Sequence, residues 1–292
     1  TSVALTSRMT RSLAAAGQIV GVRREALKPA GRGRRELHPA RRGTISLGQV
    51  RVLLGRKQHQ PAWVERLARQ LRAETQGEVL FDTASRGRYA TDASIYQQLP
   101  VGVFVPKTQR DVAIALQIAR ELGAPLLPRG GGTSQCGQTT GTALVVDFSK
   151  HLRRVLSLDV QALRAEVEPG LVLDHLNAEL KKHGLWYPVD VSTSAQATLG
   201  GMAGNNSCGS RSLFYGNMVH NVAGAQAWLS SGELLDFGPV AQAHGRAAQI
   251  ARAVHGLAEA QKDEIEARWP RVLRRVAGYN LDIFHPRSEK PY

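Results

Sequence analysis

The chain of 292 residues is 42% hydrophobic and 21% charged, and its formal net charge is +14. This composition is typical of a soluble globular protein, and the lack of an uninterrupted apolar run of about 18 residues argues against a membrane span. Cys136 and Cys208 lie far apart without metal-ligand spacing. We therefore expect two reduced thiols, with neither a disulfide framework nor a metal site.

The positive charge is concentrated at the N-terminus. Residues 1–60 carry 13 Lys and Arg against 2 Asp and Glu, whereas the remainder carries 25 against 22. We predict a separate basic arm over residues 1–60, for which three interpretations are open: a disordered or non-native leader, an Arg-rich targeting segment, or a tail attracted to polyanions. No aromatic residue precedes Trp63, and the remainder is nearly neutral, so nucleic acid is not favoured as a partner.

The first elements of the body follow from its apolar spacing. Trp63, Leu67 and Leu71 recur at helical spacing and predict a helix over residues 61–77, and residues 88–100 have no clear pattern.

Next comes a strand–helix–strand order. Residues 101–106 are apolar and predict a buried strand, and the segment after it predicts a helix that Thr108 caps and Gly123 ends. Short strands are predicted over residues 125–128 and 143–148, on either side of a glycine-rich loop.

The rest of the chain mixes strands and helices. Residues 153–160 and 163–170 alternate like an antiparallel pair, and residues 171–184 predict an amphipathic helix. A hairpin is expected over residues 223–239, followed by a mostly helical tail over residues 242–275. Because strands and helices do not alternate strictly, this order favours an α+β fold.

The glycine-rich loop PRGGGTSQCGQTTG (residues 128–141) nearly matches two phosphate-binding motifs. The dinucleotide fingerprint fails because Gln135 stands where its third glycine belongs, and the P-loop fails because Gln138 replaces its lysine. Both motifs also need a helix after the loop, and here a strand is predicted.

The loop retains the properties of an anion site. Glycines let backbone N–H groups converge on an anion without obstruction from Cβ. Thr133 and Ser134 add hydroxyl donors, and Arg129 adds a charge. The alternative is a glycine-rich surface loop.

A second segment rich in small residues, ATLGGMAGNNSCGS (residues 197–210), adds amide and hydroxyl donors. Two such segments suit one elongated ligand, with phosphates at one segment and a polar planar ring at the other. From the residues alone, we expect a nucleotide-like cofactor.

Several segments carry a resemblance to a known family: residues 88–112, 128–150, 167–180, 187–210, 215–222 and 274–282. They resemble the FAD-binding, PCMH-type domain of the vanillyl-alcohol oxidase superfamily, especially FAD-linked D-lactate dehydrogenase, the glycolate oxidase flavin subunit and fused FAD/iron–sulfur oxidoreductases. The resemblance implies an α+β fold of two subdomains, with mixed and antiparallel sheets flanked by helices, over residues 61–285. It further implies that residues 286–292 begin a connection to a cap domain missing from this chain.

The resemblance also implies a set of cofactor-binding residues. They are Arg129, Gly130, Gly131, Gly132, Thr133, Ser134, Gly137, Pro188, Thr198, Gly201, Asn205, Ser207, Gly209, Gly216 and Val222. Some superfamily members attach the flavin through a histidine at the position of Thr133, and threonine lacks a nucleophilic nitrogen, so non-covalent FAD is expected. His220 lies beside the implied flavin contacts.

By this resemblance, the chain is expected to belong to an oxidoreductase that oxidises a D-2-hydroxy acid by hydride transfer to FAD and passes electrons to a quinone, cytochrome or iron–sulfur module. Its catalytic acid and base are not assigned. A cytoplasmic location is expected, with peripheral association with the inner membrane left open. The alternative is a catalytically incompetent flavin-binding fragment or a basic interaction module.

Overall fold

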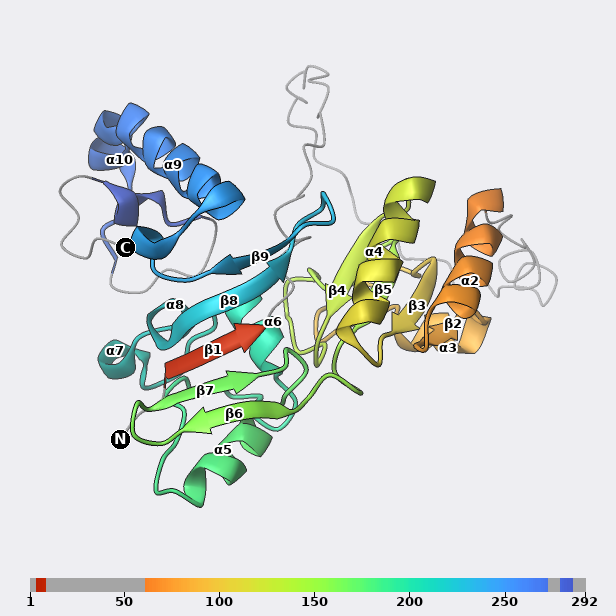
Figure 1. The fold of residues 1–292 in the computed structure, drawn as a ribbon, viewed down its shortest axis with the longest axis horizontal. Helices are drawn as coiled ribbons and strands as arrows, with labels where there is room; N and C mark the ends of the chain where they lie inside the picture. The colour runs from red at the N-terminus through yellow and green to blue at the C-terminus, as the bar shows by residue number, and fades with distance from the viewer. Residues whose placement is uncertain (1–3, 9–60, 273–278, 286–292) are drawn as a thin grey trace, which may run out of the picture.

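The computed structural model describes residues 4–8, 61–272 and 279–285. Figure 1 shows two sheets side by side, one of four strands and one of five. The elements of the four-stranded half are α2 (Ala62–Glu74), β2 (Glu78–Leu80), α3 (Thr83–Arg88), β3 (Gly102–Val105), α4 (Gln109–Leu122), β4 (Leu126–Arg129) and β5 (Leu144–Asp147).

The four-stranded sheet has the order β2-β3-β5-β4. Strands β3, β4 and β5 are parallel, and β2 runs antiparallel to β3. Side chains of β3 alternate between two apolar clusters: Phe104 packs with α2 and α4 on one face, and Val103 and Val105 pack on the other. The strand is buried on both faces, which explains why its sequence is a continuous apolar run.

Helix α4 begins and ends at the predicted residues. The Thr108 hydroxyl accepts a hydrogen bond from the Asp111 backbone N–H at 3.1 Å, and the Asp111 carboxylate accepts one from the Thr108 backbone N–H at 3.0 Å. At the other end, Gly123 has a left-handed φ of 62°. Both predictions are therefore confirmed.

The second half surrounds the five-stranded sheet of order β6-β7-β1-β8-β9. Its elements are β1 (Ala4–Arg8), β6 (Val155–Asp159), β7 (Arg164–Val167), α5 (Leu173–Lys181), α6 (Leu199–Gly204), α7 (Ser212–Tyr215), α8 (Met218–Asn221), β8 (Val222–Trp228) and β9 (Leu234–Phe237). The predicted antiparallel pairs are present as β6–β7 and β8–β9.

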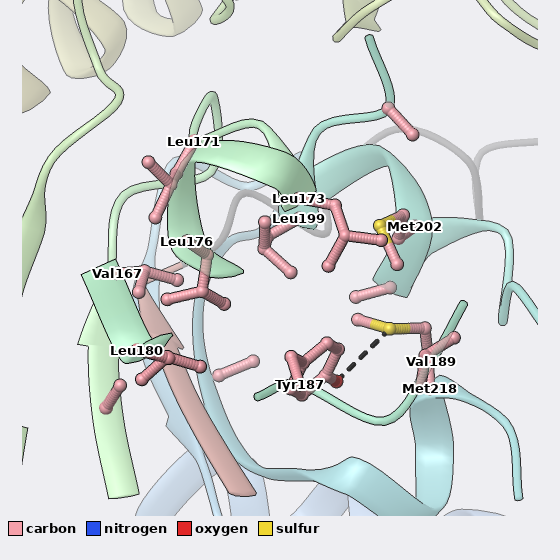
Figure 2. Packing of buried hydrophobic residues seen from close by; sticks show 14 of the residues in the cluster. Val167, Leu171, Leu173, Leu176, Leu180, Tyr187, Val189, Leu199, Met202 and Met218 are labelled. Atoms are coloured by element: carbon pink, nitrogen blue, oxygen red, sulfur yellow. Dashed lines mark hydrogen bonds between the residues drawn. The ribbon is translucent and has the colours of Figure 1, made fainter. Parts of the chain in front are cut away.

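Tyr187 lies at the centre of the core beneath this sheet. Figure 2 shows its ring between Leu180 of α5 and Met218, whose sulfur lies beside the Tyr187 hydroxyl. The Tyr187 hydroxyl donates to the Met218 sulfur at 3.2 Å and lies 3.3 Å from the carbonyl of Asn221. Burial raises the pKa of this phenol far above its usual range. The core therefore fixes α8, the short helix that precedes β8.

Strand β1 belongs to the segment expected to be a basic arm. It pairs in parallel with both β7 and β8 and so lies inside the sheet. These five residues of the arm thus form a strand, and the rest of residues 1–60 lies outside the described residues.

The two halves meet at a close backbone contact. The Gly170 N–H donates to the Leu152 carbonyl at 2.7 Å, and a Cβ on Gly170 would collide with the Phe148 carbonyl oxygen. Phe148 follows β5 and Gly170 follows β7, so the chain leaving one sheet lies directly on the chain leaving the other.

The C-terminal part contains two helices where a mostly helical tail was predicted over residues 242–275. It contains the 3₁₀ turn η1 (Val240–Gln242), α9 (Gly245–Ala260), α10 (Lys262–Arg268) and a second 3₁₀ turn, η2 (Leu281–Phe284). Residues 273–278 and the predicted connection at residues 286–292 lie outside the described residues. Within the described ranges, no helix combines the length and apolar character that crossing a bilayer requires.

Candidate cofactor site

The glycine loop after β4 packs against the chain just before α6. A Cβ on Gly130 would collide with the Thr198 hydroxyl oxygen, and a Cβ on Gly131 would collide with the Gln196 carbonyl oxygen. The two small-residue segments that the sequence assigns to one ligand therefore lie in direct contact. Their glycines permit an approach that any larger residue would prevent.

This loop presents a run of unused hydrogen-bond donors. Within the described part of the chain, none of the backbone N–H groups of residues 130–134 donates to a protein acceptor, and neither does the hydroxyl of Thr133 or Ser134. Gly132, in the middle of the run, has a left-handed φ of 66°, a conformation that lets successive amides turn toward one anion. The donors and the space left by the missing side chains fit the diphosphate of a nucleotide cofactor.

Arg129 ends β4 beneath this loop, and its guanidinium faces protein carbonyls. It donates to the carbonyls of Thr91 at 2.8 Å, Tyr89 at 3.2 Å and Thr139 at 3.3 Å. Its Cζ also lies 5.2 Å from the centroid of the Tyr89 ring. A contact between Arg129 and the cofactor stays a prediction, and the observed contacts join three stretches of backbone.

Tyr89 is itself fixed by a hydrogen bond to Asp147. Its hydroxyl donates to the Asp147 carboxylate at 2.6 Å, and burial together with this hydrogen bond raises the pKa of Tyr89 far above its usual range. The Asp147 carboxylate also accepts from the Ser149 N–H at 2.8 Å. The ring beneath the Arg129 guanidinium is thus fixed to the end of β5.

Residues 91–96, which the sequence marked only as irregular, cover the other side of the loop. The Ala93 N–H donates to the Gly132 carbonyl at 3.0 Å, and the Thr139 hydroxyl donates to Asp92 at 2.9 Å. Burial raises the pKa of Asp92, but hydrogen bonds from Ser94 and Thr139 outweigh it and leave the pKa below its ordinary value. No spacing rule identifies Asp92 or Ala93; only the polar character of this stretch could have suggested them.

Helix α6 uses its first backbone amides within the protein. The N–H groups of Leu199 and Gly200 each donate at 2.8 Å, to the carbonyls of Leu171 and Pro169. The Gly201 N–H donates to the Thr198 hydroxyl at 3.4 Å. Thr198, only 2% exposed, is therefore an N-cap residue here, and cofactor contacts from Thr198 and Gly201 stay predictions.

The end of α6 connects the loop to the remaining predicted residues. The Gln138 side-chain amide donates to the Asn205 side-chain oxygen at 3.1 Å. The Met218 N–H donates to the Ser207 carbonyl at 3.0 Å, and the Val219 N–H donates to the Asn206 side chain at 3.1 Å. Residues 205–207 thus lie between the glycine loop and helix α8.

Gly209 lies against Asp190, which forms a charged contact, and Pro188 precedes Asp190 by two residues. A Cβ on Gly209 would collide with the Asp190 carbonyl oxygen, and Pro188 is buried two residues before Asp190. The Asp190 carboxylate accepts from the Arg211 Nε at 3.0 Å and the Ser210 hydroxyl at 2.8 Å. Burial raises the pKa of Asp190, and these hydrogen bonds more than offset that effect and lower it.

Gly216 and Val222 flank helix α8. A Cβ on Gly216 would meet the imidazole of His220, whose Nδ1 accepts from the Asn217 N–H at 3.0 Å. Val222 opens β8. The sequence suggested His220 as a neighbour of the flavin, and the structure shows it holding the turn before β8.

Several predicted cofactor residues are connected to one another by contacts. Gly130 and Gly131 contact the segment that ends at Thr198, and residues 205–207 link the loop to the turn that contains Gly216. Gly137 packs under the Tyr96 ring.

Cys136 is exposed and Cys208 half-buried, both as free thiols. Among the described residues, no group of three or more His, Cys, Asp or Glu is placed to hold a metal ion.

The fold is that of flavoproteins of the PCMH type. The structure of p-cresol methylhydroxylase aligns with a TM-score of 0.52 at 18% identity, over 64% of this chain and 38% of that one. The two-subdomain α+β fold, with mixed and antiparallel sheets flanked by helices, is therefore confirmed.

The sequence comparisons identify the family. Residues 100–238 match the family model of the FAD binding domain. D-2-hydroxyglutarate dehydrogenase of Pseudomonas putida is 36% identical over 228 residues, 73% of this chain. Glycolate oxidase subunit GlcD of Bacillus subtilis is 35% identical over 170 residues, 56% of this chain. Residues 100–238 therefore form a domain of the FAD binding family, and the cofactor is FAD.

The relatives are much longer than the matched region. This chain covers 22% of the Pseudomonas putida protein and 36% of the Bacillus subtilis protein. The comparisons thus concern only part of those proteins.

Proposed function

We propose that this chain provides the FAD-binding portion of an oxidoreductase that oxidises a D-2-hydroxy acid. The observation that carries the proposal is the run of unused amide donors at residues 130–134, placed against the segment that ends at Thr198. The substrate class rests on the names of the relatives, a D-2-hydroxyglutarate dehydrogenase and a glycolate oxidase subunit.

The FAD diphosphate would lie in the glycine loop. The five amides of residues 130–134 and the hydroxyls of Thr133 and Ser134 would donate to its oxygens, and residues 205–222 would line the rest of the cofactor. Bound flavin supplies a hydride acceptor. Because threonine offers no nucleophilic nitrogen at position 133, we propose non-covalent attachment.

Substrate binding and proton transfer would involve groups outside the site described above. Oxidation of a 2-hydroxy acid needs a base near the substrate hydroxyl, and our proposal assigns no residue of this chain to that role. Our proposal also assigns no residue of this chain to electron transfer from the flavin to its acceptor. For that acceptor we propose a quinone, a cytochrome or an iron–sulfur module. We further propose that the enzyme is cytoplasmic and that it associates with the inner membrane if its acceptor is a quinone.

Binding of FAD to the purified protein tests the proposal directly. We expect a bound-flavin absorption spectrum, either as isolated or after FAD is added and the excess removed. Acid precipitation should release the flavin into the supernatant. No uptake of FAD would refute the proposal, and flavin that stays with the precipitate would refute non-covalent attachment.

Anaerobic reduction tests the proposed chemistry. Because we assign the base to groups outside this site, the chain loaded with FAD should show little bleaching with D-lactate or D-2-hydroxyglutarate. Rapid bleaching would contradict that assignment. Bleaching by the D enantiomer in a longer protein containing this domain would support the substrate class, and no bleaching there by any D-2-hydroxy acid would refute it.

A further inference from the structure

We propose that Arg129 is a positioning residue of the cofactor site: it clamps the glycine loop by binding backbone carbonyls, and neutral amides bind the diphosphate. The inference rests on the proposed function of the loop. It differs from the sequence-based prediction, in which Arg129 supplies a charge to the phosphates.

The first observation is where the guanidinium donates. Its Nη2 donates to the Thr91 carbonyl at 2.8 Å, and its Nη1 is shared between the carbonyls of Tyr89 and Thr139 at 3.2 and 3.3 Å. Thr91 lies in the segment that covers the loop, and Thr139 lies in the loop itself. A planar guanidinium can serve several acceptors at fixed angles, whereas a lysine ammonium acts as a single point charge.

The second observation is the position of the guanidinium relative to Gly132. A Cβ on Gly132 would lie 2.6 Å from the Arg129 Nη2, so the guanidinium takes the place of a side chain at the turn of the loop. The Gly132 carbonyl meanwhile accepts from the Ala93 N–H at 3.0 Å. The guanidinium and residues 91–93 therefore hold this turn together.

The third observation is the support on which the guanidinium rests. Its Cζ lies 5.2 Å from the centroid of the Tyr89 ring, within the range of a cation–π contact. The Tyr89 hydroxyl is bonded to the Asp147 carboxylate at 2.6 Å. The clamp is thus anchored to β5, while the amides of residues 130–134 have no protein acceptor in the described part of the chain.

Two substitutions of Arg129 distinguish a clamp from a phosphate ligand. Arg129→Lys keeps the charge but replaces the two guanidinium nitrogens that reach the three carbonyls with a single nitrogen, and Arg129→Gln removes the charge. For a clamp, we expect both to raise the Kd for FAD by a similar factor, about tenfold or more, since each costs at least one charged hydrogen bond. The salt dependence of the Kd should match that of the wild type, because no cation–phosphate pair is lost.

Hydrogen exchange in the protein without FAD gives an independent readout. A clamp supports the loop before any ligand binds, so the amides of Ala93 and Thr140, which donate to the carbonyls of Gly132 and Gly137, should exchange faster in both variants. A phosphate ligand would leave these rates unchanged. If the wild type binds no FAD, the proposed function is refuted. The exchange rates still test the clamp in that case, because they are measured without FAD.

A pair of Tyr89 variants tests the clamp with the charge of Arg129 intact. Tyr89→Leu removes the supporting ring and should accelerate exchange at Ala93 and raise the Kd for FAD. Tyr89→Phe keeps the ring, loses only the bond to Asp147, and should stay within about threefold of the wild type, as expected for one hydrogen bond. Circular dichroism confirms that each variant is folded. The proposal is overturned if Arg129→Lys binds FAD like the wild type while Arg129→Gln binds weakly with a reduced salt dependence.

Discussion

Two glycine-rich segments of this protein have similar compositions and different roles. In the loop of residues 130–134 the backbone amides have no acceptor among the described residues, whereas the first amides of α6 all donate to protein oxygens. Glycine allows close approach in both places, to Gln196 from the loop and to Pro169 from α6. Glycine content alone therefore does not define an anion site. A glycine-rich segment can bind an anion only where its backbone amides do not already donate to protein acceptors.

The largest expected effect comes from a carboxylate in the loop. Gly131→Asp would place a negative charge beside the proposed diphosphate and a Cβ against the Gln196 carbonyl. We expect FAD affinity to fall at least about 100-fold, because like charges at a desolvated site repel strongly. Equilibrium titration followed by flavin fluorescence measures the loss. Gly131→Ala is the steric control and should lose less; unaltered binding by Gly131→Asp would place the cofactor elsewhere.

A substitution in the second segment should act on stability instead. A Cβ on Gly200 would lie 2.7 Å from the Pro169 carbonyl oxygen, so Gly200→Ala should lower the free energy of unfolding by about 1–3 kcal/mol through overpacking. Thermal and urea unfolding measure it, and FAD affinity of the folded molecules should change little.

Gly204 supplies the matched control in the same helix. A Cβ there meets no atom within 4 Å, so Gly204→Ala should be neutral or stabilise the fold by up to about 1 kcal/mol. If Gly200→Ala weakened FAD binding without changing stability, the contrast between the two segments would fail.

The smallest expected effect is a response to acid. Hydrogen bonds from Ser94 and Thr139 hold the pKa of Asp92 below its ordinary value of 3.8. A lowered folded-state pKa contributes stability above the ordinary value and loses it as pH falls through the lowered one. FAD affinity should therefore decline below pH about 4, whereas the caps of α6 are neutral and should not titrate.

Asp92→Asn provides the comparison for this acid response. The variant should bind FAD somewhat more weakly at pH 7 and show a flatter pH profile between pH 5 and 3. Titrations across this range measure both quantities. Identical profiles for the wild type and Asp92→Asn would show that the carboxylate does not support the loop.

Local signals predicted much of the fold. Thr108 and Gly123 bound α4 because capping depends on residues within one turn. The hairpin between β8 and β9 followed from the alternation of its strands and from Gly232 in its turn. Helix α6 was not predicted as a helix, because LGGMAG has poor intrinsic propensity and its amides are satisfied by distant carbonyls.

The candidate site was predicted in part. Its two segments were recognised as partners, and contacts at Gly130 and Gly131 place them together. The carbonyl contacts of Arg129 and the support from residues 91–93 could not be foreseen. They depend on which backbone atoms the tertiary fold brings within hydrogen-bonding distance, and a cation beside glycines indicates a phosphate ligand and a clamp equally well.

The close backbone contact at Gly170 has a consequence for the time course of cofactor binding. No side chain separates Gly170 from the carbonyls of Phe148 and Leu152, so the two halves could move apart only by breaking a main-chain contact. The walls of the site would then stand in place before FAD arrives, and no slow closing step would follow the encounter. In rapid mixing, the observed rate should rise linearly with FAD concentration without reaching a plateau.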